Sequence, residues 1–170
     1  DIAASLAMIT WMIIDWIRQG KPNMVGAMTG AVAGLVTITP AAGFVQPWAA
    51  AVIGLICAFV CYGAIMLRSR MGWDDALDVW GVHGVGGALG TILVGVFAGV
   101  AVNSVSGLIE GNVHQFLVQL LGAVLAIVYS FVLTYVLLRL VNLVTPVRVP
   151  EKIEIGGLDE GLFGEEAYGE

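Results

Sequence analysis

A histidine inside an uncharged apolar stretch is the residue of this sequence best placed to do chemistry. His83 lies in the run Asp78-Val-Trp-Gly-Val-His-Gly-Val-Gly-Gly87, and residues 79–109 contain no Asp, Glu, Lys or Arg. A neutral imidazole has one hydrogen-bond donor and one acceptor, so it can relay a proton or bind a small polar solute. On a helix, Val79 and Gly87 lie one turn before and after it and leave space at its edge. The alternative is a structural histidine bonded to another helix, and the local residues do not decide between the two.

Three acids precede this histidine. A helix that begins at Asp74 would carry His83 about 13 Å along its axis, near the middle of a membrane. We expect Asp74 and Asp75 to cap free amides in the first turn. Asp78 lies about 6 Å deeper than Asp74, so it needs a fixed partner, and we predict that it anchors the helix.

The other polar or reactive residues suggest structural roles. Cys57 and Cys61 share a helix face without His or carboxylate neighbours, so we expect packing rather than metal binding. No metal and no cofactor is predicted. Asp15 is expected to pair with Arg18 or to extend towards the membrane surface, and His114 to be a solvated surface residue.

The composition indicates an integral membrane protein. The chain has 170 residues, of which 59% are hydrophobic and 12% charged, with a mean hydropathy of +0.94. Soluble domains carry about a quarter charged residues. The net charge of −6 is concentrated at the end, where residues 151–170 hold seven acids and one base, and nothing indicates nucleic-acid binding.

Apolar runs and helix-stopping residues predict an all-α, polytopic bundle of five membrane-spanning helices. The expected spans are about 2–17, 24–39, 47–67, 75–102 and 113–141, which together form a bundle over residues 1–141. Residues 142–170 form an acidic tail.

Basic residues set the predicted orientation. All seven fall at the end of the first, third and fifth spans or after it, and the alternate loops, 40–46 and 103–112, have none. Because Lys and Arg favour the cytoplasmic side, the N-terminus is expected outside and the C-terminus in the cytoplasm.

Small residues recur at four-residue spacing in two spans. Gly26, Gly30 and Gly34 lie in the second, and Gly86 and Gly90 in the fourth. Because lipid supplies no hydrophobic drive between helices, such residues are expected to let helices pack closely.

Three motifs resemble the ammonium transporter (Amt/Mep/Rh) family. They are residues 78–87, the run Gly30-Ala-Val-Ala-Gly-Leu-Val-Thr-Ile-Thr-Pro-Ala-Ala-Gly-Phe44, and the tail segments Gly157-Leu-Asp and Gly164-Glu-Glu-Ala-Tyr168. The tail departs from the family where Phe163 replaces a frequent histidine.

The resemblance implies a C-terminal half: helices seven to eleven of an eleven-helix protomer, without the N-terminal half. It implies a homotrimer in the cell membrane in which ammonium loses a proton and ammonia passes two histidines. His83 would be the second of these, and Val79, Val32 and Thr39 would also line the pore. A PII-type regulatory protein is a further implied partner.

Two other functions remain as alternatives. An ammonium sensor would signal through cytoplasmic partners, although the tail is short for a signalling domain. A membrane enzyme using His83, Asp78 and His114 is disfavoured, because the predicted topology separates Asp78 from His114. We therefore predict a transport protein rather than an enzyme.

Overall fold

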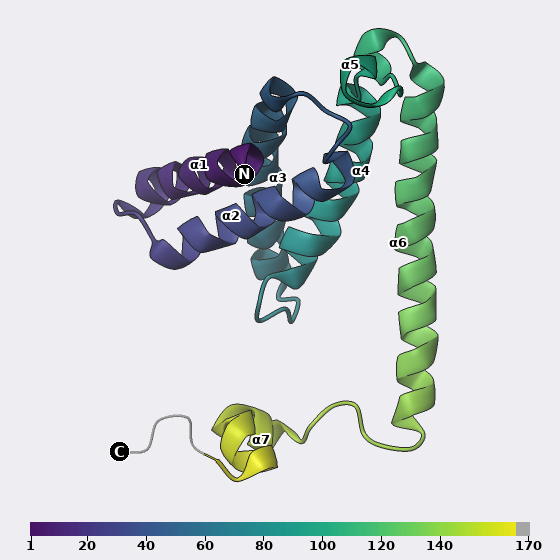
Figure 1. Ribbon diagram of the computed structural model, residues 1–170. Coiled ribbons are helices and arrows are strands. Elements are labelled where there is room, and N and C mark those ends of the chain that lie inside the picture. Colours follow the sequence, from purple (N-terminus) through teal and green to yellow (C-terminus); the bar gives the residue numbers. More distant parts are fainter. Residues whose placement is uncertain (166–170) are drawn as a thin grey trace. The chain divides into compact units, whose positions relative to one another are not determined.

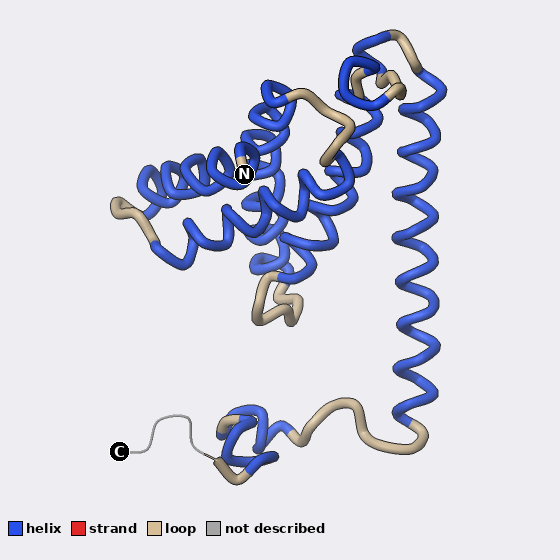
Figure 2. Tube along the Cα trace, in the orientation of Figure 1, coloured by secondary structure: helices blue, strands red, loops and turns tan. Residues whose placement is uncertain are grey.

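A computed structural model describes residues 1–165, and this part of the chain contains helices and no strand (Figure 2). The tail acids Glu166 and Glu170, and the end of the motif at Ala167 and Tyr168, lie outside the described residues. The longer helices are α1 (Ile2–Gln19), α2 (Met24–Ile38), α3 (Pro47–Met71), the π-helix η2 (Trp80–Val85) continued by α4 (Gly86–Phe97), and α6 (Val113–Asn142). Short elements are η1 (Thr39–Ala41), α5 (Val100–Asn103), η3 (Leu108–Glu110), α7 (Glu151–Gly156) and η4 (Asp159–Phe163).

The all-helical membrane fold is confirmed. Among residues 1–165, four helical stretches are long and apolar enough to cross a membrane: Met24–Ala41, Pro47–Met71, Trp80–Phe97 and Val113–Asn142. Helix α1, which carries Asp15 and Arg18, is not among them, so the first of the five expected spans stays a prediction.

Close backbone approach joins the first three helices (Figure 1). A Cβ built on Gly34 of α2 would lie 2.7 Å from the Ala3 carbonyl oxygen, and one on Gly54 of α3 would lie 2.5 Å from the same atom. A Cβ built on Gly30 would lie 2.6 Å from Trp11 Cβ and 3.0 Å from the Ala7 carbonyl oxygen. The expected role of the small residues in packing is therefore observed for Gly30 and Gly34.

The predicted start of the fourth span was wrong. The helix does not begin near residue 75, because Asp78 has φ +55°, in the left-handed region. The Asp75 carboxylate accepts hydrogen bonds from the amides of Val79 (2.9 Å) and Trp80 (2.8 Å), so it caps the helix from outside. Short acidic side chains often make such bonds in place of helical ones. The 13 Å depth estimated for His83 from Asp74 therefore does not apply.

An ion pair fixes this helix start to the preceding helix. The Arg68 guanidinium at the end of α3 donates to the Asp78 carboxylate, and both side chains are less than a third exposed. Arg68 is thus the partner that Asp78 needs.

The fourth span also ends earlier than the predicted residue 102. The helix stops at Phe97, and Ala98 and Gly99 are extended. The Gly99 amide donates to the Phe44 carbonyl (3.0 Å), and the Glu110 side chain accepts from the Val100 amide (3.0 Å). These bonds satisfy backbone groups that a continued helix would have paired internally.

The chain divides into two compact units, of which the second begins at Val128. Helix α6 begins where the Asn112 side chain accepts a hydrogen bond from the Gln115 amide (3.0 Å) and so caps the first turn. In the second unit, Arg148 pairs with Glu154 at 3.1 Å.

We predict that Gly34→Ala destabilises the protein by about 1–3 kcal/mol, because the added methyl meets the backbone of Ala3 and Ala4. The matched control is Gly63→Ala in α3, where a Cβ meets nothing within 4 Å and helix propensity improves. Thermal unfolding in detergent should show a lower midpoint for the first variant only. Equal midpoints would show that α1 and α2 do not approach as closely as described.

A double-mutant cycle with Arg68→Gln and Asp78→Asn should give a coupling energy of about 1 kcal/mol, because the pair is partly buried and tethers the helix start. Asn tolerates the left-handed backbone at residue 78. The control cycle on Arg148 and Glu154, whose side chains are 79% and 38% exposed, should give a coupling near zero. Additive effects of the Arg68 and Asp78 substitutions would contradict the assignment.

Candidate functional site

A pocket of about 490 Å³ lies between the end of α2 and the helix formed by η2 and α4. Its lining has no carboxyl or ammonium group and combines apolar surface with two hydroxyls and one imidazole. The lining residues are Val36, Thr39, Pro40, His83, Gly87 and Thr91.

His83 lies within the π-helical turn, and its side chain is exposed. Its ring has no hydrogen-bond partner in the part of the chain that the structure describes. The buried neighbours of the turn are Gly81 and Val82, so the turn places the imidazole on the opposite, open side. Single π-turns inside helices occur frequently at functional sites.

Two glycines of α4 set how closely this helix approaches the end of α2, which forms the other side of the pocket. A Cβ on Gly86 would lie 3.0 Å from the Thr37 hydroxyl, and one on Gly90 would lie 2.9 Å from Pro40 Cγ. These two glycines let the helix rest directly on the end of α2. Gly87 differs, because a Cβ there meets nothing within 4 Å. It borders the open pocket one turn beyond His83.

The hydroxyl of each lining threonine bonds to the backbone carbonyl four residues earlier. The Thr39 hydroxyl donates to the Leu35 carbonyl (2.7 Å), and the Thr91 hydroxyl donates to the Gly87 carbonyl (3.0 Å). Thr91 was missed by sequence reasoning. The available signal was its position eight residues after His83 and four after Gly87, on the same face of one helix.

The structure brings together two of the four predicted pore residues. His83 and Thr39 share the pocket, whereas Val32 and Val79 are exposed side chains outside its lining. Val36, one turn after Val32 on α2, lines the pocket instead. The pore roles of Val32 and Val79 stay predictions.

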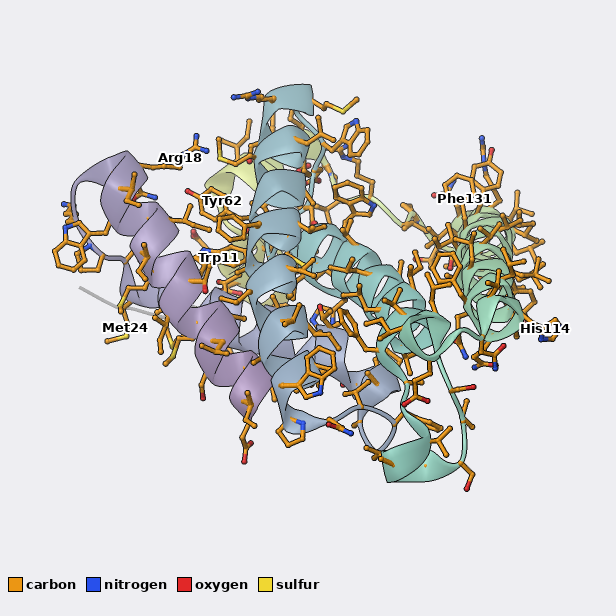
Figure 3. The ribbon with its side chains drawn as sticks, turned by 90° about the horizontal axis from the view of Figure 1, so that it is seen from above. Trp11, Arg18, Met24, Tyr62, His114 and Phe131 are labelled. Atoms are coloured by element: carbon orange, nitrogen blue, oxygen red, sulfur yellow. The ribbon has the colours of Figure 1, made fainter. Side chains whose placement is uncertain are left out.

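The other polar candidates lie elsewhere. Asp15 is 3% exposed and accepts hydrogen bonds from Gln19 (3.0 Å) and the Tyr62 hydroxyl (3.2 Å). The Arg18 guanidinium instead stands 5.5 Å from the centre of the Tyr62 ring (Figure 3), so an Asp15–Arg18 ion pair was the wrong expectation. His114 is exposed near the start of α6.

The two thiols belong to the core. Cys57 and Cys61 are fully buried, with their sulfurs 3.8 Å apart, and the Thr37 hydroxyl lies 3.0 Å from Cys57 Sγ. They pack in one cluster with Trp11 and Val82.

The pocket offers hydroxyl and imidazole groups to a solute, and its lining has no carboxylate, ammonium or guanidinium group. A cation that left water to enter it would find no compensating charge among the lining residues, which makes that transfer costly. A small neutral solute with N–H or O–H groups would find acceptors, and the imidazole can exchange a proton with it.

Comparisons with known proteins agree on one family. The family model described as "Ammonium Transporter Family" matches residues 1–168. An ammonium transporter of Bacillus subtilis is 43% identical over 99% of this chain and 42% of its own length. One from Aquifex aeolicus is 45% identical over 98% of this chain and 40% of its own length. The chain thus spans less than half of these relatives.

Solved structures share the fold. The crystal structure of Saccharomyces cerevisiae Mep2 superposes with a TM-score of 0.82 at 39% identity, covering 89% of this chain and 36% of that one. A structure titled "Sensor Amt Protein" gives a TM-score of 0.82 at 30% identity, covering 93% and 39%. The family model matches nearly the whole of this chain, and the chain shares a polytopic helical fold with Mep2. The chain therefore belongs to the ammonium transporter family.

Proposed function

We propose that this chain is the C-terminal half of an ammonium transporter, and that it contributes one wall of a pore that conducts ammonia or ammonium past two histidines. His83 is the second histidine of that pair. The observation that carries the proposal is an imidazole without a hydrogen-bond partner in residues 1–165, facing a pocket whose lining is uncharged.

The physical basis is selection by desolvation. Ammonium resembles potassium in size and charge, so a site for hydrated cations would not separate them. Ammonium can release a proton and become neutral ammonia, whereas a metal ion has no proton to release. Ammonia then crosses an apolar path at a lower desolvation cost than a cation. The imidazole nitrogens of His83 accept and return protons along this path.

The pore wall extends from the pocket along two helices. Thr39 lines it beside His83, and Val79 and Val32 continue it. Asp78 anchors the helix through Arg68 and does not touch the substrate. No metal, cofactor or catalysed reaction is part of this function.

The assembly requires surfaces that the chain itself does not cover. In the described residues of α6, Ala123 is buried and long apolar side chains are exposed. We propose that lipid, the N-terminal half of the same protomer and the other copies of a homotrimer cover such surfaces.

The setting is a cell membrane, with the C-terminus in the cytoplasm as the distribution of Lys and Arg favours. The acidic tail then faces cytoplasmic regulators, among which a PII-type protein is proposed.

A sensor of ammonium is the second candidate function. It is favoured by the structural likeness to the protein titled "Sensor Amt Protein". Flux in proteoliposomes separates the two: a transporter carries methylammonium, whereas a sensor without transport binds it and gives no flux.

We predict that His83→Ala in the full-length protein lowers methylammonium flux by at least about tenfold or admits potassium, because the proton relay is lost. The matched control is His114→Ala, which removes an exposed imidazole outside the pocket and should leave flux unchanged. Uptake of labelled methylammonium, with potassium flux in parallel, measures both effects. Wild-type flux and selectivity in His83→Ala would refute the role of His83.

Gly87→Leu should reduce flux about tenfold without loss of fold, because a side chain at this position enters the open pocket. Gly63→Leu is the control, since its Cβ also has free space but lies on α3 outside the pocket. The same uptake assay, normalised to protein in the membrane, compares them. Full flux through Gly87→Leu would place the conduction path elsewhere.

A further inference from the structure

The two hydroxyls of the pocket have a fixed hydrogen-bonding polarity. Each threonine hydroxyl has one proton, and in both residues that proton is donated to the backbone carbonyl four residues earlier. The lone pairs of Thr39 Oγ1 and Thr91 Oγ1 are the groups left for a solute. Towards the pocket, both residues therefore act as acceptors.

We propose that Thr91 is a substrate-binding residue, and that it forms with Thr39 and His83 a binding station for a small amine rich in N–H groups. This inference rests on the proposed function and adds to it the residue that recognises the substrate. Neither the sequence motifs nor the predicted pore set include Thr91.

Ammonia matches the polarity of this station. It has three N–H donors and one lone pair, and the station has two hydroxyl acceptors and an imidazole. Two N–H groups bond to the hydroxyls, while the imidazole either donates to the nitrogen lone pair or accepts the third N–H. Water offers two donors and two lone pairs, so it too can bond to both hydroxyls and to the imidazole. The station therefore accepts N–H and O–H donors by hydrogen-bond direction, and its lining without carboxylate or ammonium groups disfavours cations.

A structural role of the hydroxyl is the competing explanation. Threonine often bonds to the carbonyl four residues earlier in membrane helices, and this bond alone indicates no ligand. Thr29 of α2 makes such a bond to Val25 (2.9 Å) and does not line the pocket. Thr91 differs from it in bordering the same pocket as His83 and Thr39.

The test compares Thr91→Val, Thr91→Ser and Thr29→Val in the full-length transporter. Valine keeps the shape of threonine and removes the hydroxyl, so Thr91→Val should raise the KM for ammonium and methylammonium about fivefold and change kcat less than about twofold. Thr91→Ser, which restores the hydroxyl, and Thr29→Val, which removes a hydroxyl outside the pocket, should both keep the wild-type KM.

A wild-type KM in Thr91→Val, with transport intact, overturns the station and leaves the proposed function standing. Absence of flux in the wild-type protein instead overturns the proposed function. In that event calorimetric binding of methylammonium to purified protein tests the station directly, with weaker binding in Thr91→Val as the expected result and unchanged binding as the contrary one. If the Thr91→Val protein does not accumulate in the membrane, Thr91→Ala replaces it in both assays, with the same expected results.

Discussion

Backbone contact between helices is the constraint on which the rest of this structure depends. Lipid tails are as apolar as the side chains they surround, so helices gain stability by packing closely rather than by leaving water. Gly34 and Gly54 both rest against Ala3, and Gly86 and Gly90 rest against the end of α2. The second pair sets the distance between α2 and the helix that carries His83. The pocket exists because Gly87, on the adjacent face, has no such contact.

The start of the histidine-bearing helix is held by charged side chains as well as by apolar packing. Asp75 caps the amides of Val79 and Trp80, and Asp78 turns the chain into the helix while it pairs with Arg68. These carboxylates come directly before the π-turn that presents the imidazole. This charged anchor can lie close to the pocket because Arg68 balances the charge of Asp78 and backbone amides bind the Asp75 carboxylate, so neither acid joins the pocket lining.

Hydrogen bonds from side chains to the helix backbone set the polarity of the pocket. Threonine hydroxyls that donate to helix carbonyls offer lone pairs to a solute, and the lining contains no charged side chain. Such a surface suits a solute with several N–H groups and no net charge. Membership of the ammonium transporter family and this local chemistry therefore point in the same direction, although the first comes from the whole sequence and the second from three side chains.

The sequence by itself determined the membrane class, the helices α2, α3 and α6 to within a few residues, and the histidine motif. These features depend on local apolar runs and helix-stopping residues, which can be identified in each segment of the sequence without knowing what packs against it. Only the tertiary structure decided that the fourth helix begins after Asp78, that Asp15 bonds to Tyr62 rather than pairing with Arg18, and that Thr91 joins His83 and Thr39. Each of these depends on a partner outside the local sequence window: Arg68 for Asp78, α3 for Asp15, and the end of α2 for Thr91. Hydrophobic periodicity carries no information about such partners, because it reports which face of a helix is apolar and not what lies opposite to it.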